Sequence, residues 1–142
     1  MRDHFPELDG VTVRVGLTKR RSVLGLASLG ETPMIWIRPR RIHRCAIAHE
    51  LTHLLQARKL LPGGEKTCDL YTLARSPLLI DIAPFYLKVP ARFHEGGRDR
   101  RVPPAAAAAL HAIAREATAG RSARAAIIRF EKRARESLFE VG

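Results

Sequence analysis

Cysteine, long apolar runs and aromatic residues are scarce in this chain, and the first two shortages exclude whole classes of protein. Only Cys45 and Cys68 occur among 142 residues, so we expect no disulfide framework and no secretion. The most apolar runs, 77–87 and 103–114, are too short and too interrupted to span a membrane. Residues 1–8 contain no apolar stretch of signal-peptide length. We therefore expect a single-domain cytoplasmic protein without a membrane segment.

Acidic side chains are also few, 14 against 25 lysines and arginines, which gives a formal net charge of +11. Such an excess favours contact with nucleic-acid phosphates or with an acidic protein. Only 6% of the residues are aromatic, however, and none interleaves with the basic runs, as a platform for single-stranded nucleic acid requires. We expect weak, non-specific nucleic-acid contact at most. A regulatory or binding module with a basic surface is the alternative function.

The run His49-Glu50-Leu51-Thr52-His53 is an H-E-x-x-H motif. Residues four apart share one face of a helix, so His49 and His53 can both present an imidazole to one zinc ion. Glu50 is one step round the helix, beside the metal, where a general base can take a proton from a zinc-bound water. The flanking residues are apolar nearly all round the helix, so it should be buried, and buried histidines need partners. Zinc would supply them.

A catalytic zinc takes three protein ligands and keeps a fourth position for water, so two histidines leave one ligand to be found. Glu65 is our first choice because it follows the turn Pro62-Gly63-Gly64. Asp69 lies four residues further on the same helical face, where it could orient a histidine ligand from outside the metal sphere. This arrangement requires the first helix to end near Ala57 or the second to cross it steeply.

Several other residues are open alternatives for the ligand and donor roles. Asp69 itself, Asp81 and His94 could replace Glu65 as the third ligand. Cys45, four residues before His49, could close the site as a fourth ligand, although a small buried residue is its usual role. The candidates for a donor that stabilises the oxyanion of the reaction are Tyr71, Tyr86 and His94.

These residues resemble a known family. The motif at 49–53, followed by the run Glu65-Lys66-Thr67-Cys68-Asp69-Leu70-Tyr71-Thr72-Leu73-Ala74, is similar to the gluzincin zinc metallopeptidases, and most of all to the minigluzincins and ImmA/IrrE-type peptidases. The similarity covers residues 34–75. It implies that His49, His53 and Glu65 bind zinc, that Glu50 is the catalytic base and that Asp69 is a carboxylate behind a ligand. It also implies that residues 34–38 form the strand at the edge of a substrate cleft.

We therefore expect a zinc-dependent metallopeptidase, a hydrolase whose substrate is a peptide or protein. In such an enzyme zinc activates water and polarises the scissile carbonyl, while Glu50 accepts the water's proton and passes it to the leaving amine. The alternative is a zincin-fold binding module without turnover.

The periodicity predicts an α+β, zincin-like fold over residues 1–142. Strands are expected at 11–15, 22–28 and 34–38, paired antiparallel into a small sheet on the active-site helix. Helices are expected at 42–59, 65–74, 104–119 and 122–138, with an irregular segment from 76 to 93. Residues 1–97 would form the catalytic core, and 98–142 would form a C-terminal helical extension.

Overall fold

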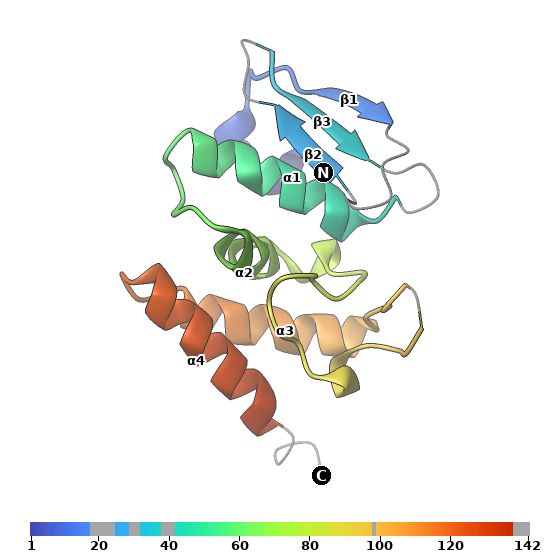
Figure 1. The fold of residues 1–142 in the computed structure, drawn as a ribbon, viewed down its shortest axis with the longest axis vertical. Coiled ribbons are helices and arrows are strands. Elements are labelled where there is room, and N and C mark those ends of the chain that lie inside the picture. The colour runs from blue at the N-terminus through green and yellow to red at the C-terminus, as the bar shows by residue number, and fades with distance from the viewer. Residues whose placement is uncertain (18–24, 29–31, 38–41, 98, 138–142) are drawn as a thin grey trace.

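The computed structural model describes residues 1–17, 25–28, 32–37, 42–97 and 99–137. These residues form a small three-stranded sheet, a helix α1 (Arg44–Ala57) packed against it, and three further helices beyond α1 (Figure 1). The expected α+β architecture, with an N-terminal sheet on the motif helix, is confirmed at this level. No helix within the described part is both long and apolar enough to cross a bilayer.

The sheet contains β1 (Arg14–Leu17), β2 (Gly25–Ser28) and β3 (Met34–Ile37) in the order β1-β3-β2. β2 pairs antiparallel with β3, as predicted, but β1 pairs with β3 in parallel, so uniform antiparallel pairing was wrong. β3 is therefore the central strand of the described sheet, so it has no free edge to which an extended peptide could add as a further strand. Ile35 and Ile37 explain this position, because both are almost fully buried against α1. Residues 22–24 and 38 of the predicted strands lie outside the described residues.

α1 begins at Arg44 because a carboxylate far along the chain caps it. Asp81 accepts hydrogen bonds from the backbone N–H groups of Arg44 (2.7 Å) and Cys45 (3.0 Å). A negative charge at this end also interacts favourably with the positive end of the helix dipole. Asp81, considered above as a metal ligand, is thus a helix cap here.

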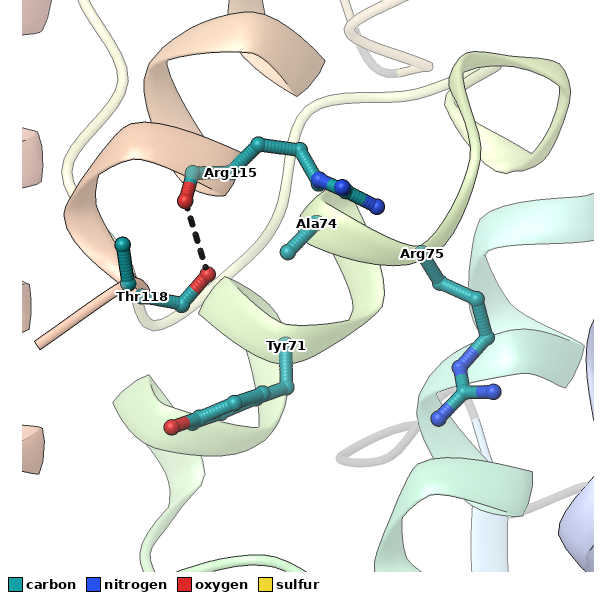
Figure 2. A pocket seen from close by; sticks show the side chains of 6 residues that line it. Tyr71, Ala74, Arg75, Arg115 and Thr118 are labelled. Carbon is teal, nitrogen blue, oxygen red and sulfur yellow. Dashed lines mark hydrogen bonds between the residues drawn. The ribbon is translucent and has the colours of Figure 1, made fainter. Parts of the chain in front are cut away.

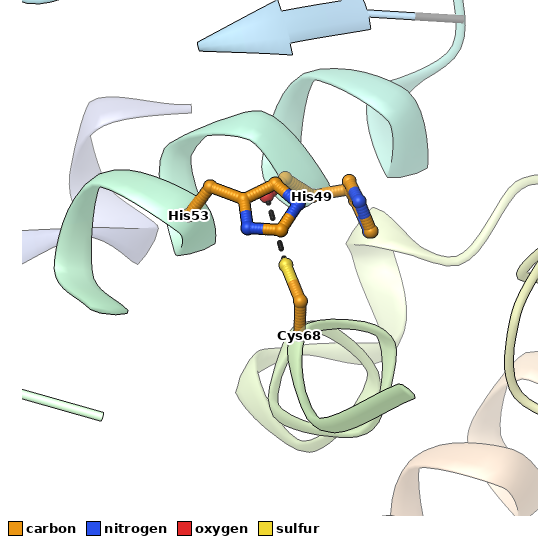
Figure 3. A group of neighbouring side chains, drawn as sticks. All are labelled: His49, His53 and Cys68. Carbon is orange, nitrogen blue, oxygen red and sulfur yellow. Dashed lines mark hydrogen bonds between the residues drawn. The ribbon is translucent and has the colours of Figure 1, made fainter. Parts of the chain in front are cut away.

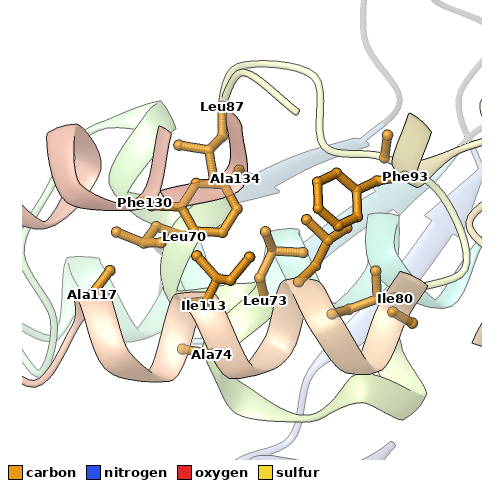
Figure 4. Close-up of a cluster of buried hydrophobic side chains, with 14 of the residues drawn as sticks. Leu70, Leu73, Ala74, Ile80, Leu87, Phe93, Ile113, Ala117, Phe130 and Ala134 are labelled. Atoms are coloured by element: carbon orange, nitrogen blue, oxygen red, sulfur yellow. The ribbon is translucent and has the colours of Figure 1, made fainter. Parts of the chain in front are cut away.

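The remaining helices share a second core. α2 (Glu65–Arg75), α3 (Pro104–Ala117) and α4 (Ala123–Glu136) bury apolar faces against one another (Figure 4). Leu70 and Leu73 of α2 pack in the same cluster as Leu110 of α3 and Phe130 of α4. Residue 138, the expected end of the last helix, is outside the described residues. α2 therefore separates the sheet and α1 from α3 and α4, and it contributes to both halves of the molecule.

Between α2 and α3 the chain is irregular, as its prolines predict. Ser76 caps a short 3-10 turn, η3 (Pro77–Leu79), by accepting a hydrogen bond from the Leu78 N–H. A second such turn is η4 (Ala91–Phe93), and an isolated bridge joins Ile82 to Arg101. This segment carries Asp81 to the start of α1, and it passes over the metal-ligand candidates at Tyr86.

Candidate metal centre

Three side chains from two helices converge on one point. His49 and His53 lie on the same face of α1, with ring centroids 4.6 Å apart and planes nearly perpendicular. The Nε2 atom of each histidine lies 3.2 Å from Oε2 of Glu65, the first residue of α2. The sequence-predicted ligands are therefore brought together, two from one helix and one from the next.

The end of α1 makes this convergence possible. The helix stops at Ala57, and Lys59 takes a left-handed conformation with φ of 60°. Gly64 then turns the chain into α2 with φ of 105°, a value that favours glycine. The helix thus ends at Ala57, as the ligand geometry above requires, and not at residue 59 as the periodicity predicted. This earlier end places Glu65 beside His53.

The other nitrogen of each imidazole is also held. His49 Nδ1 donates to Oδ1 of Asp69 at 2.8 Å, and His53 Nδ1 donates to Oε1 of Gln56 at 2.7 Å. With a proton on each Nδ1, both Nε2 lone pairs are free to bind a metal. Asp69 stands behind the histidine, where it was predicted, whereas Gln56 was not anticipated.

Asp69 also holds the loop over the site. Its second oxygen accepts hydrogen bonds from the backbone N–H groups of Tyr86 (2.8 Å) and Leu87 (3.0 Å). The Tyr86 ring lies nearly parallel to that of His49, with centroids 6.0 Å apart. One buried carboxylate therefore orients both a candidate ligand and the aromatic residue above it.

Cys68 is a further donor near the histidines, and Figure 3 shows it beneath them. Its Sγ and one nitrogen of each of His49 and His53 lie within 4.8 Å of one another, so this group could hold a metal ion. In the structure, however, the thiol donates to the His49 backbone carbonyl at 3.2 Å. Burial, followed by the charges of Asp69 and Glu65, raises the pKa of Cys68 well above its usual range and keeps the thiol protonated.

The two distances from Glu65 to the histidines are compatible with a tetrahedral ion on the carboxylate side. Ligand atoms about 2.0–2.2 Å from such an ion are roughly 3.3–3.5 Å apart. The 3.2 Å separations between Glu65 and the two histidines are close to that value. Glu65 is also half exposed, whereas the Cys68 thiol is buried.

Glu50 lies on α1 directly beside His49, with only 5% of its surface exposed. Burial raises the pKa of its carboxyl group, although the neighbouring histidines oppose the effect. Within the described residues no hydrogen-bond donor contacts this carboxylate. The Glu50 oxygens are not among the buried atoms that lack a partner, so the carboxylate still reaches solvent beside the two histidines, where a general base can take a proton from water.

Of the three candidates for the oxyanion donor, only Tyr86 lies at the centre. Burial and the nearby charges of Glu65 and Asp69 raise the pKa of the Tyr86 phenol, so it remains a hydrogen-bond donor. Tyr71 instead lines a separate open hollow of about 350 Å³ between α2 and α3, together with Arg75, Arg115 and Thr118 (Figure 2). His94 follows η4 and contacts the Glu95 carbonyl.

Cys45 has a structural environment rather than a metal environment. Its side chain is buried, and its backbone N–H is bound by Asp81. Burial, with smaller contributions from Asp69 and Asp81, raises the pKa of its thiol far above the usual range. Cys45 is not part of the donor group found around the two histidines in the described chain.

Comparison with protein-family models, with curated proteins and with solved structures finds no match to this chain. The assignment of function therefore rests on the site itself.

Proposed function

We propose that the protein is a zinc-dependent peptidase of the gluzincin type. One observation carries the proposal: the Nε2 atoms of two histidines each lie 3.2 Å from one carboxylate oxygen of Glu65, and the buried Glu50 is next to the histidines on their helix. Two histidines and a glutamate are the ligand set of known catalytic zinc sites in hydrolases, and such a set leaves one position open for water.

Each residue then has a distinct task. Zinc, when bound by His49, His53 and Glu65, supplies a Lewis acid that acidifies water and polarises a carbonyl group. Glu50 accepts a proton from the attacking water and returns it to the leaving amine. Tyr86 donates its phenolic hydrogen to the oxygen on which negative charge develops.

The sheet offers a place for an extended substrate. In the order β1-β3-β2, the described part of the sheet leaves one edge of β2 without a partner strand. β2 also lies against α1, which carries the motif (Figure 1). A peptide that adds to β2 would satisfy its backbone hydrogen-bonding groups there. We therefore assign substrate binding to β2 in place of β3.

The first test is metal content. Protein purified without added metal is expected to contain about one zinc per chain, because the converging donors form one site. His53→Ala should lose the metal, whereas the matched control Cys68→Ser should retain it, since the thiol is a hydrogen-bond donor in our assignment. Elemental analysis of the three proteins decides this, together with digestion of a broad peptide library.

Zinc lost from Cys68→Ser but retained in Glu65→Gln would assign the third ligand to sulfur and point to a structural site. Wild-type protein without zinc and without peptide cleavage would contradict the proposal. Sequence-selective nucleic-acid binding at physiological salt would then favour a basic binding module, for which Arg124, Lys132 and Arg135 are exposed on α4.

Replacing Tyr86 by phenylalanine tests the oxyanion donor. The ring and its stacking on His49 are kept, and only the phenolic hydroxyl is removed. We expect kcat to fall by about 10²–10³-fold with little change in KM, as for other lost oxyanion donors. Steady-state kinetics on a cleaved peptide measures this, with Tyr71→Phe as the control in the separate hollow. Equal activity of wild type and Tyr86→Phe would remove Tyr86 from the mechanism.

A further inference from the structure

Gln56 is bonded to both sides of the metal centre. It lies on the last turn of α1, three residues after His53 and thus on the same helical face. Its Oε1 lies 2.7 Å from Nδ1 of His53. Its Nε2 donates to the backbone carbonyls of Pro62 at 2.8 Å and Gly64 at 3.0 Å, in the loop that leads to Glu65.

This arrangement leaves one orientation for the amide of Gln56. The two carbonyl oxygens can only accept hydrogen bonds, so the NH₂ group must face them. The amide oxygen must then face His53, and Nδ1 must carry a proton to donate to it. The Nε2 atom of His53 then faces Oε2 of Glu65 at 3.2 Å, on the side where a metal would bind. Backbone carbonyls of the loop thus select the tautomer of a metal ligand.

The same side chain closes the turn between the helices. Gly64 has a left-handed backbone, and its carbonyl also accepts the first helical bond of α2, from the Cys68 N–H at 2.9 Å. The loop residues Pro62, Gly63 and Gly64 are all exposed and have no apolar contact in the core clusters. The two bonds from Gln56 therefore join this exposed loop to α1 at the point where Glu65 follows.

We propose that Gln56 is a positioning residue that couples His53 to Glu65. It sets the tautomer of His53 with its oxygen, and with its nitrogen it holds the loop that places Glu65 at the metal. The inference rests on the proposed zinc site, and it assigns a function to a side chain that is neither a ligand nor a reacting group. Loss of the amide oxygen should weaken zinc binding by freeing the imidazole of His53. Loss of the amide nitrogen should weaken it by releasing the loop before Glu65.

Two substitutions separate the routes. Gln56→Glu keeps an oxygen that accepts from His53, but its carboxylate cannot donate to the two carbonyls and is repelled by them, so the tether is lost while the acceptor is kept. Gln56→Met keeps the length of the side chain and loses both functions. Zinc affinity, measured by chelator competition, should fall about 10–100-fold in Gln56→Met, as for other groups behind a ligand, and by a similar factor in Gln56→Glu.

A double-mutant cycle tests the coupling. In a Glu65→Gln background, Gln56→Glu should change zinc affinity by less than about twofold, because the ligand that the tether positions has already been removed. Zinc affinity in Gln56→Glu equal to wild type would overturn the tether. If the losses of zinc affinity in Gln56→Glu and Glu65→Gln are fully additive in the double variant, Gln56 does not act through Glu65.

A metal-free measurement keeps this inference separate from the zinc site itself. Nitrogen-15 NMR of the metal-free protein should show a proton held on Nδ1 of His53 in wild type and the loss of this fixed protonation in Gln56→Met. Amide hydrogen exchange at 63–65 should be faster in both variants, while urea unfolding controls for the fold. If wild type binds no zinc, the proposed function fails and these spectra still test Gln56. If wild type binds zinc but the tautomer and exchange do not change, only the role of Gln56 fails.

Discussion

Glutamine in place of Glu50 is expected to reduce peptide hydrolysis by about 10²–10⁴-fold while zinc remains bound. The substitution keeps the shape of the side chain and removes the group that accepts the proton. Glu50 lies beside the proposed ligands and is not one of them. Zinc affinity should therefore depend much less on the charge of Glu50 than hydrolysis does. Rates on a peptide that wild type cleaves, measured alongside zinc content, give both quantities.

The control for this variant is an exposed helical glutamate far from the site, Glu116 on α3. Glu116→Gln should leave hydrolysis unchanged. Glu50 is buried and its pKa is raised by burial, so the neutral amide should not lower the free energy of unfolding, which urea titration checks. Turnover by Glu50→Gln at the wild-type rate would show that another group is the base.

The second large effect separates Glu65 from Asp69. Glu65→Gln should weaken zinc binding by more than about 100-fold, because it replaces an anionic ligand by a poor neutral donor, whereas a carboxylate behind a ligand typically accounts for 10–100-fold. Half of the Glu65 side chain is exposed, and within the described residues its carboxylate contacts the two histidines. The metal-free stability of Glu65→Gln should therefore equal that of wild type.

Asp69→Asn, unlike Glu65→Gln, should lower the free energy of unfolding of the protein. Both oxygens of this buried carboxylate accept hydrogen bonds, one from His49 and the other from two backbone N–H groups. An asparagine has one acceptor oxygen, so at least one of these donors loses its partner, at a cost of about 1–3 kcal/mol in the free energy of unfolding. Chelator competition and urea unfolding of both variants measure the pair of effects. A greater affinity loss in Asp69→Asn than in Glu65→Gln would exchange the two assignments.

The local pattern of the chain was sufficient for most of the elements. The apolar residues around the H-E-x-x-H motif predicted a buried helix, and the turn at Pro62-Gly63-Gly64 predicted a second helix from Glu65, where α2 begins. The alanine-rich helix after Pro103 was likewise expected, and it is α3. These features depend on contacts between residues three or four apart, which a sequence displays directly.

The pairing of the strands and the capping of α1 could not be predicted from the local sequence pattern. The parallel pairing of β1 with β3 depends on which strand the core buries most completely, and Asp81 caps a helix that begins 37 residues earlier in the chain. Gln56 carries no recognisable motif, since its role depends on where two loop carbonyls lie. The motif histidines and their spacing therefore predict a metal centre from residue type alone. The approach of Glu65 to the two histidines, the hydrogen bonds of the imidazoles and the place of Tyr86 above His49 depend on long-range contacts, because a helix end, a left-handed turn and one buried carboxylate must meet in space before they act together.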